Sequence, residues 1–108
     1  MKGRSATVKE RELHSRIAAL GCIACRIDGV FNDRVSIHHI HGRTKKNAHK
    51  MVLPLCAGHH QDGYGPVKMT AVHPYKKRFE KEYGLQDELC AWAYELIGED
   101  LDEWLADD

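Results

Sequence analysis

The stretch SIHHIHGRTKKNAHKMVLPLCAGHH, residues 36–60, holds six of the chain's eight histidines and one of its four cysteines. Two short β-prone runs, RVSIHHI and MVLPL, flank ten polar residues that have neither helical nor strand period. The segment CAGHHQ follows the second run and can begin a helix. The predicted order is therefore strand, long basic loop, strand and helix, a ββα arrangement with histidines on each part.

Helices are predicted on both sides of this unit. Thr7 is a suitable N-cap with Glu10 as its capping-box partner, which predicts a helix over residues 7–20. A second helix is expected from HPYKKRFEKEYG, with Pro74 in its first turn and Gly84 as its stop. A last helix, residues 86–97, carries apolar residues at helical spacing that we expect in the core: Leu85, Leu89, Trp92, Ala93, Leu96 and Ile97.

The length of the chain, 108 residues, predicts a single domain, residues 1–108, with a core small enough to gain from a metal site. We expect residues 1–6 to be a tail and residues 21–62 to form the metal knuckles and ββα core. Residues 73–108 should form the C-terminal helices, with a last turn docked by Leu101, Trp104 and Leu105. The expected fold class is α+β, with flanking helices around the ββα unit.

The net charge of zero conceals an uneven distribution. Residues 1–81 contain all 16 lysines and arginines and six acids, whereas residues 82–108 contain ten acids and no lysine or arginine. A basic body of this kind is typical of a protein that binds a phosphate backbone. The acidic end should face away from that ligand or cover something basic.

Membrane and disulfide roles are not expected from this sequence. It has no apolar run near the roughly 20 residues needed to cross a bilayer and no apolar N-terminal signal run. We therefore expect a cytoplasmic protein with reduced thiols.

Two paired-ligand knuckles predict a structural zinc site. Cys22 and Cys25 are separated by two residues, as are Cys56 and His59, and thirty residues separate the pairs. Each tight turn can aim two side chains at one ion, and thiolate with imidazole is the tetrahedral ligand set that zinc prefers. His60 could replace His59 as the fourth ligand. Cys90 has no second cysteine or histidine near it in the sequence and is expected to be a small buried residue.

Most of the histidines outside the predicted zinc site belong to segments that resemble a known protein family. The segments IHHIHGRT, LPLCAGHH and HPYKKRFEKEYG together resemble the HNH, or ββα-metal (His-Me finger), endonucleases, and most closely the phage recombination-enhancement (Ref-like) RecA-dependent nucleases. The resemblance covers about residues 20–84. It implies a zinc-stapled ββα-metal fold, DNA as substrate, a phage or prophage role in recombination and a RecA-type recombinase filament as partner.

The resemblance also implies site residues. His38 and His60 correspond to ligands of a catalytic divalent ion (Mg, Mn or Zn), and His39 corresponds to the general base. His73 is either a third ligand or a histidine that caps the following helix or lies at the surface. An imidazole with a pKa near 6.5 can take a proton from water near neutral pH, and a cation can stabilise the charge of the reacting phosphate.

The strand geometry leaves some roles open. Neighbours on an ideal strand point to opposite faces, so His38 and His39 reach one site only if the strand ends or bulges. His41 shares the face of His39 and could substitute for either. The residue that orients the base is expected shortly before LPLC, where we favour His49 over Asn47. His14, on the first helix, is expected at the surface.

Basic residues flank this predicted site. We expect DNA phosphates to contact six of them, three in the loop and three on the helix after Pro74: Arg43, Lys45, Lys46, Lys76, Lys77 and Arg78. Phe79 and Tyr83 should form the buried face of that helix. The sequence thus favours a metal-dependent DNA endonuclease with weak sequence preference, and the alternative is a non-catalytic zinc-stabilised module that binds DNA or a protein.

Overall fold

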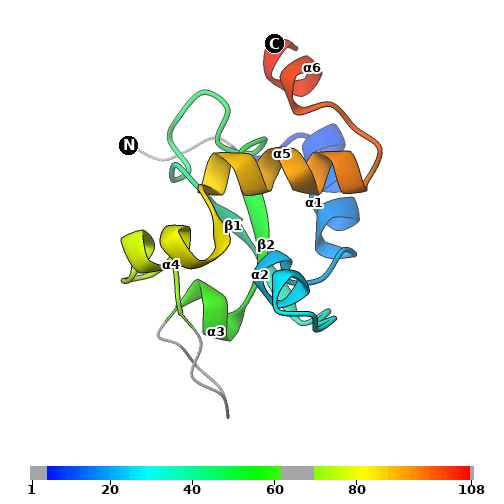
Figure 1. Cartoon of the computed structure of the whole chain (residues 1–108). Coiled ribbons are helices and arrows are strands. Elements are labelled where there is room, and N and C mark those ends of the chain that lie inside the picture. Colours follow the sequence, from blue (N-terminus) through cyan, green and yellow to red (C-terminus); the bar gives the residue numbers. More distant parts are fainter. Residues whose placement is uncertain (1–4, 62–69, 108) are drawn as a thin grey trace.

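The computed structural model describes residues 5–61 and 70–107, and these form a small α+β fold built around one antiparallel strand pair. Strand β1 (Val35–His39) pairs with β2 (Val52–Cys56), with Val35 opposite Cys56 and His39 opposite Val52. Helix α3 (Ala57–His60) follows β2 directly, so the predicted strand, loop, strand and helix order is present (Figure 1). The pairing is regular through His39, without a bulge.

Helix α1 (Val8–Ala18) begins as predicted. The Thr7 hydroxyl accepts from the Glu10 backbone N–H, and the Glu10 carboxylate accepts from the Thr7 N–H, which completes the capping box. Gly21 ends this region with a φ of 80°, a conformation that glycine adopts without strain. The prediction missed α2 (Ile23–Ile27), because only a turn was expected through CIAC. The helix is stabilised at its start by the Cys22 thiol, which accepts from the Cys25 N–H.

Three helices complete the chain. Helix α4 (Lys76–Tyr83) ends at Gly84 as predicted, but it begins after Tyr75, so Pro74 lies before the helix and not in its first turn. Helix α5 (Gln86–Leu96) matches its prediction within one residue, and α6 (Leu101–Ala106) replaces the expected final turn. Residues 62–69 lie outside the described part of the chain. They include residue 62, where the ββα core was predicted to end.

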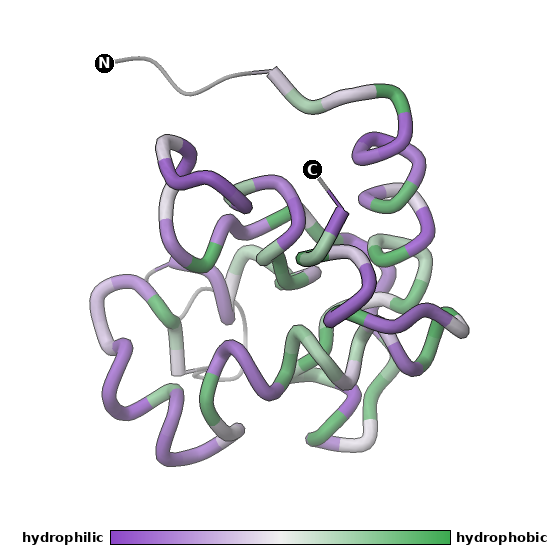
Figure 2. The backbone as a smooth tube through the Cα atoms, turned by 90° about the horizontal axis from the view of Figure 1, so that it is seen from above, coloured by the Kyte–Doolittle hydropathy of each residue, from purple (hydrophilic) through white to green (hydrophobic). Residues whose placement is uncertain are grey.

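The core lies where β2 meets α1, α2 and α5. Every residue of β2 is buried, and Leu13 and Ile17 of α1 pack in the same cluster as Leu89 and Ala93 of α5. Seen from above, hydrophilic residues predominate on many of the outer turns (Figure 2). Cys90, Phe79 and Tyr83 are buried as predicted.

The prediction for the face of α5 was partly wrong. Leu85 is 55% exposed and Leu96 is 38% exposed, whereas Tyr94, which was not predicted in the core, is fully buried. Tyr94 is tolerated there because its hydroxyl donates to the Lys50 carbonyl at 2.7 Å, so burial leaves no unpaired polar group.

The acidic C-terminal segment covers basic groups, which was one of the two expected arrangements. Arg16 of α1 pairs with Glu99, and Lys9 pairs with Asp107. The buried Lys50 ammonium donates to the backbone carbonyls of Trp104 and Asp107, at the C-terminal end of α6. A cation there is favourable because carbonyls at the end of a helix have no partner within the helix. None of the described helices is both long and apolar enough to traverse a lipid bilayer.

Candidate functional site

Four buried Cys and His side chains meet where α2, the end of β2 and α3 come together. Nδ1 of His59 lies 3.4 Å from Sγ of Cys22, 3.5 Å from Sγ of Cys25 and 3.3 Å from Sγ of Cys56. Burial raises the pKa of the Cys22 thiol to about 12. A bound cation reverses that tendency because it binds thiolates. This set of donors fits a metal such as zinc, and it contains the four predicted ligands.

Tyr83 and Asp28 lie next to Nε2 of His59, the imidazole nitrogen that does not face the thiols. The Tyr83 hydroxyl lies 3.0 Å from Nε2 of His59 and donates to Asp28 at 2.8 Å. Oδ2 of Asp28 is also 3.7 Å from Nε2 of His59. A partner on the second ring nitrogen fixes the tautomer of a metal-binding histidine and leaves Nδ1 for the ion. The sequence prediction missed both partners because they come from α4 and from the residue after α2.

A second cluster joins His38 of β1, His60 of α3 and His73, which precedes α4. One ring nitrogen from each lies within 4.8 Å of the others. The rings of His38 and His60 are 5.0 Å apart, and those of His38 and His73 are 5.2 Å apart, between centroids. Burial lowers the pKa of His38 to about 4 and lowers that of His60, so both imidazoles are neutral and able to bind a cation at neutral pH.

Two of these histidines have a hydrogen-bond partner on one ring nitrogen. Nε2 of His38 lies 2.7 Å from Oε1 of the buried Gln86, and Nδ1 of His60 lies 3.1 Å from Oγ of Ser36. This leaves Nδ1 of His38 and Nε2 of His60 as the candidate ligand atoms, the arrangement expected of oriented metal ligands. Neither Gln86 nor Ser36 was singled out in the sequence, because no local pattern indicates that α5 reaches β1.

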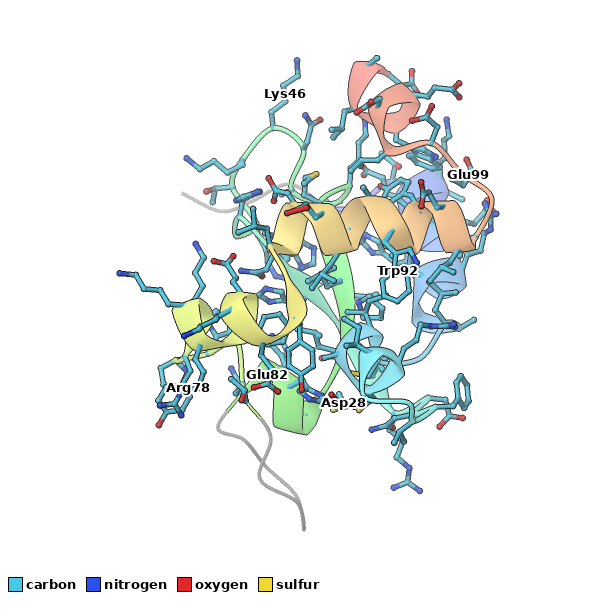
Figure 3. All side chains as sticks on the ribbon, in the orientation of Figure 1. Asp28, Lys46, Arg78, Glu82, Trp92 and Glu99 are labelled. Atoms are coloured by element: carbon cyan, nitrogen blue, oxygen red, sulfur yellow. The ribbon has the colours of Figure 1, made fainter. Side chains whose placement is uncertain are left out.

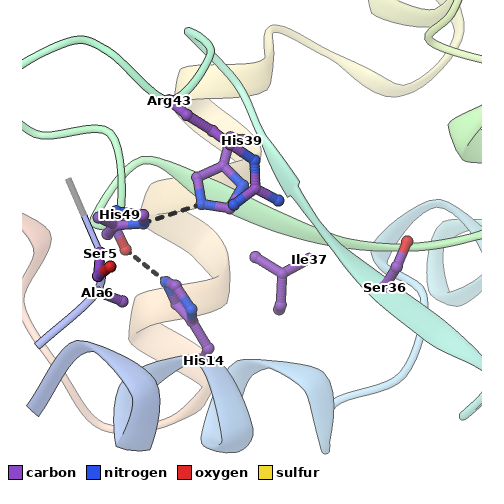
Figure 4. A pocket seen from close by; sticks show the side chains of 8 residues that line it. All are labelled: Ser5, Ala6, His14, Ser36, Ile37, His39, Arg43 and His49. Atoms are coloured by element: carbon purple, nitrogen blue, oxygen red, sulfur yellow. Dashed lines mark hydrogen bonds between the residues drawn. The ribbon is translucent and has the colours of Figure 1, made fainter. Parts of the chain in front are cut away.

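His39 belongs to a third cluster, with His49 and His14. Nε2 of His39 is 3.1 Å from Nδ1 of His49, and His14 donates from Nε2 to the His49 carbonyl at 2.6 Å (Figure 4). His14 is half-buried in this contact and lines a pocket, so it is more enclosed than the predicted surface position implied. Burial, followed by the charge of Arg43, lowers the pKa of His39 to about 4.

The regular pairing of β1 separates the two histidine clusters. His38 faces α3 and His39 faces α1 and the loop, as alternation along a strand requires. A pocket of about 610 Å³ runs beside β1 and is lined by Ser36, His39, Arg43 and His49 among others. Ser36 lines this pocket and also contacts His60 of the other cluster.

The remaining predicted residues lie around these clusters. His41 is exposed and its Nε2 pairs with Asp87 of α5 at 3.0 Å, away from both histidine clusters. Asn47 is half-buried in the loop, where its carbonyl accepts from the Lys50 and Met51 N–H groups. The six residues predicted to contact DNA are all exposed, and Figure 3 shows Lys46 and Arg78 projecting outward from the loop and from α4.

These features define a small α+β protein whose buried Cys and His cluster can bind a metal such as zinc. Its sequence matches the family described as "recombination enhancement, RecA-dependent nuclease" over residues 6–98. The match spans most of the chain, and the protein belongs to this family. Membership confirms the Ref-like part of the predicted resemblance and implies a nuclease, and so a hydrolase, that acts in recombination and involves DNA and RecA.

Proposed function

We propose that the protein is a metal-dependent DNA endonuclease of the ββα-metal (HNH) type. The observation that supports this most directly is the pair of histidine clusters on the two faces of β1, one suited to an ion and the other containing a supported imidazole. Cys22, Cys25, Cys56 and His59 hold a structural zinc in this proposal, and His38, His60 and His73 hold the catalytic divalent ion.

The chain's own groups divide the reaction between the two clusters. His39 takes a proton from the attacking water, and it can do so with Nδ1 in the tautomer whose Nε2–H donates to His49. His49 therefore orients the base. The divalent ion, when bound, stabilises negative charge on the phosphate and on the leaving oxygen. Gln86 and Ser36 keep the ligand histidines in the required tautomers.

Contacts to DNA would come mainly through phosphates. The exposed cations of the loop lie between His39 and His49 in the sequence, those of α4 follow His73, and Lys or Arg contacts to phosphate carry no base information. We therefore expect weak intrinsic sequence preference. In a RecA-dependent family, a recombinase filament paired with the target would supply the choice of site.

The test is a nicking assay on plasmid DNA paired with a RecA filament, with EDTA or with added Mg, Mn or Zn. The variants are His39→Ala, His60→Ala and the matched control His41→Ala, which removes an exposed imidazole outside both clusters. Loss of the base should reduce the rate by about 10² or more. The control should retain the wild-type rate.

Two results would argue against the proposal. Unchanged nicking by His39→Ala would remove its role as the base, and equal nicking in EDTA and in Mg would remove the requirement for an ion. If the wild type binds DNA and zinc but cuts under no condition, the non-catalytic binding module becomes the better account.

A further inference from the structure

The third histidine cluster has the geometry of a metal site in its own right. His14, His39 and His49 each offer a ring nitrogen, and the three atoms lie within 4.8 Å of one another. We propose that these three residues form an additional transition-metal site, distinct from the zinc cluster and from the His38, His60 and His73 cluster. Occupation of this site would inhibit the nuclease, a consequence that depends on the function proposed above.

The distances agree with shared coordination. Nε2 of His39 and Nδ1 of His49 are 3.1 Å apart. Two nitrogens bound to one tetrahedral zinc at 2.0–2.1 Å are separated by roughly 3.3 Å. The ring of His14 lies 5.9 Å from that of His39 and 6.1 Å from that of His49, between centroids. The three nitrogens are therefore grouped in one place before an ion binds.

The three ligands come from separate segments that the fold holds in place. His14 lies on α1, which is anchored by Leu13 and Ile17 in the core and by its capping box. His39 is the last residue of β1 and pairs with Val52. His49 is buried in the loop before β2. Ligands positioned before binding reduce the ordering cost of metal binding.

The kind of ion follows from the donors and their surroundings. Three imidazoles without a carboxylate or thiolate suit Zn, Co, Ni or Cu better than Mg, and the same preference applies to the His38, His60 and His73 cluster. The cluster lines the pocket of about 610 Å³, which leaves room for water or an anion at a fourth position. Arg43 lines the same pocket, and its positive charge should make this site weaker than the zinc cluster.

The consequence for activity is a difference between metals. An ion at this site binds the same imidazole that the proposed reaction uses as its base, so His39 can no longer accept a proton from water. Zn added beyond the amount that gives maximal nicking should therefore inhibit the reaction, whereas the same excess of Mg should not.

Equilibrium dialysis against Co²⁺ counts the sites directly, on protein that already carries its structural zinc. The variant is His14→Gln, whose side-chain amide can still donate to the His49 carbonyl but offers no imidazole. His41→Gln is the matched control. We expect the wild type and the control each to bind one more Co²⁺ per chain than His14→Gln binds. The visible absorption spectrum of this additional ion should show no sign of sulfur ligands.

The difference between variants, and not the total, decides the result. Equal Co²⁺ uptake by the wild type and His14→Gln would overturn the proposal, even if the His38, His60 and His73 cluster binds an ion. The difference can also be measured if no nicking is found, so failure of the nuclease function is distinguished from failure of this site. Where nicking occurs, His14→Gln should lose at least tenfold of its sensitivity to excess Zn, relative to its own maximal rate in the metal that best supports nicking.

Discussion

His39 and His49 are ten positions apart in the chain, yet Nε2 of one lies 3.1 Å from Nδ1 of the other. The loop between β1 and β2 brings them together, because it returns the chain to the start of β2 opposite His39. One imidazole is thereby oriented by another, with His49 buried and His39 facing a pocket. This geometry supports the proposed roles of His39 as the base and His49 as its orienting residue.

Two replacements of His49 should distinguish its proposed role in orienting His39 from its contribution to packing. In His49→Asn the side-chain oxygen can still accept from His39, so we expect nicking within a few fold of the wild type. In His49→Leu the acceptor is lost and the rate should fall about tenfold or more, because the base is no longer held. Equal rates for the two variants, at similar melting temperatures, would contradict the orienting role.

The sequence was sufficient for the features that depend on local spacing. The Thr7 and Glu10 capping box, the two strands and the pairs Cys22 and Cys25, Cys56 and His59 all involve residues a few positions apart, and the structure contains each of them. The α+β class follows from the same local signals.

Contacts between distant segments could not be predicted. His14 approaches His49 because α1 packs across the sheet, and Gln86 approaches His38 because α5 does so from another side. Both residues look like ordinary exposed helix positions in the sequence. The core was misjudged for a similar reason, because Leu85 precedes α5 and its exposure depends on where α4 ends.

Loss of the proposed zinc site, formed by Cys22, Cys25, Cys56 and His59, should unfold the domain. Cys25→Ala removes one of four buried ligands, and a structural zinc supplies much of the folding free energy of a small domain. We expect no cooperative melting transition at 25 °C and above, measured by circular dichroism. Cys90→Ala is the matched control, since Cys90 is equally buried but lies outside the cluster, and it should cost about 1 kcal/mol and keep one zinc per chain.

The Tyr83 hydroxyl should slow the release of zinc. It lies between Nε2 of His59 and Asp28, so Tyr83→Phe removes the partner that orients this ligand while keeping the ring in the core. Loss of such a partner typically costs 10–100-fold in metal affinity, about the change expected in the zinc release rate to a coloured chelator. Tyr75→Phe, at an exposed ring, should release zinc at the wild-type rate.

The Lys50 ammonium should hold α6 against the body of the protein. Lys50→Met keeps most of the buried side chain but removes the donor to the Trp104 and Asp107 carbonyls, each such charged hydrogen bond being worth about 1.5–3 kcal/mol. Amide hydrogen exchange in α6 should accelerate at least tenfold while exchange in β2 is unchanged. The exposed Lys45→Met serves as the control, and faster exchange there too would indicate a general loss of stability.

The basic face of α4 should determine how DNA binding responds to salt. Lys76, Lys77 and Arg78 are exposed, and each phosphate contact contributes about 0.9 to the slope of log K against log salt concentration. Replacing all three with alanine should therefore reduce the slope by about 2–3, measured by fluorescence anisotropy with duplex DNA at several salt concentrations. Lys9→Ala is the control, because Lys9 pairs with Asp107 and lies over the Trp104 ring. An unchanged slope in the triple variant would place the phosphate contacts elsewhere, with Arg43, Lys45 and Lys46 as the next residues to replace.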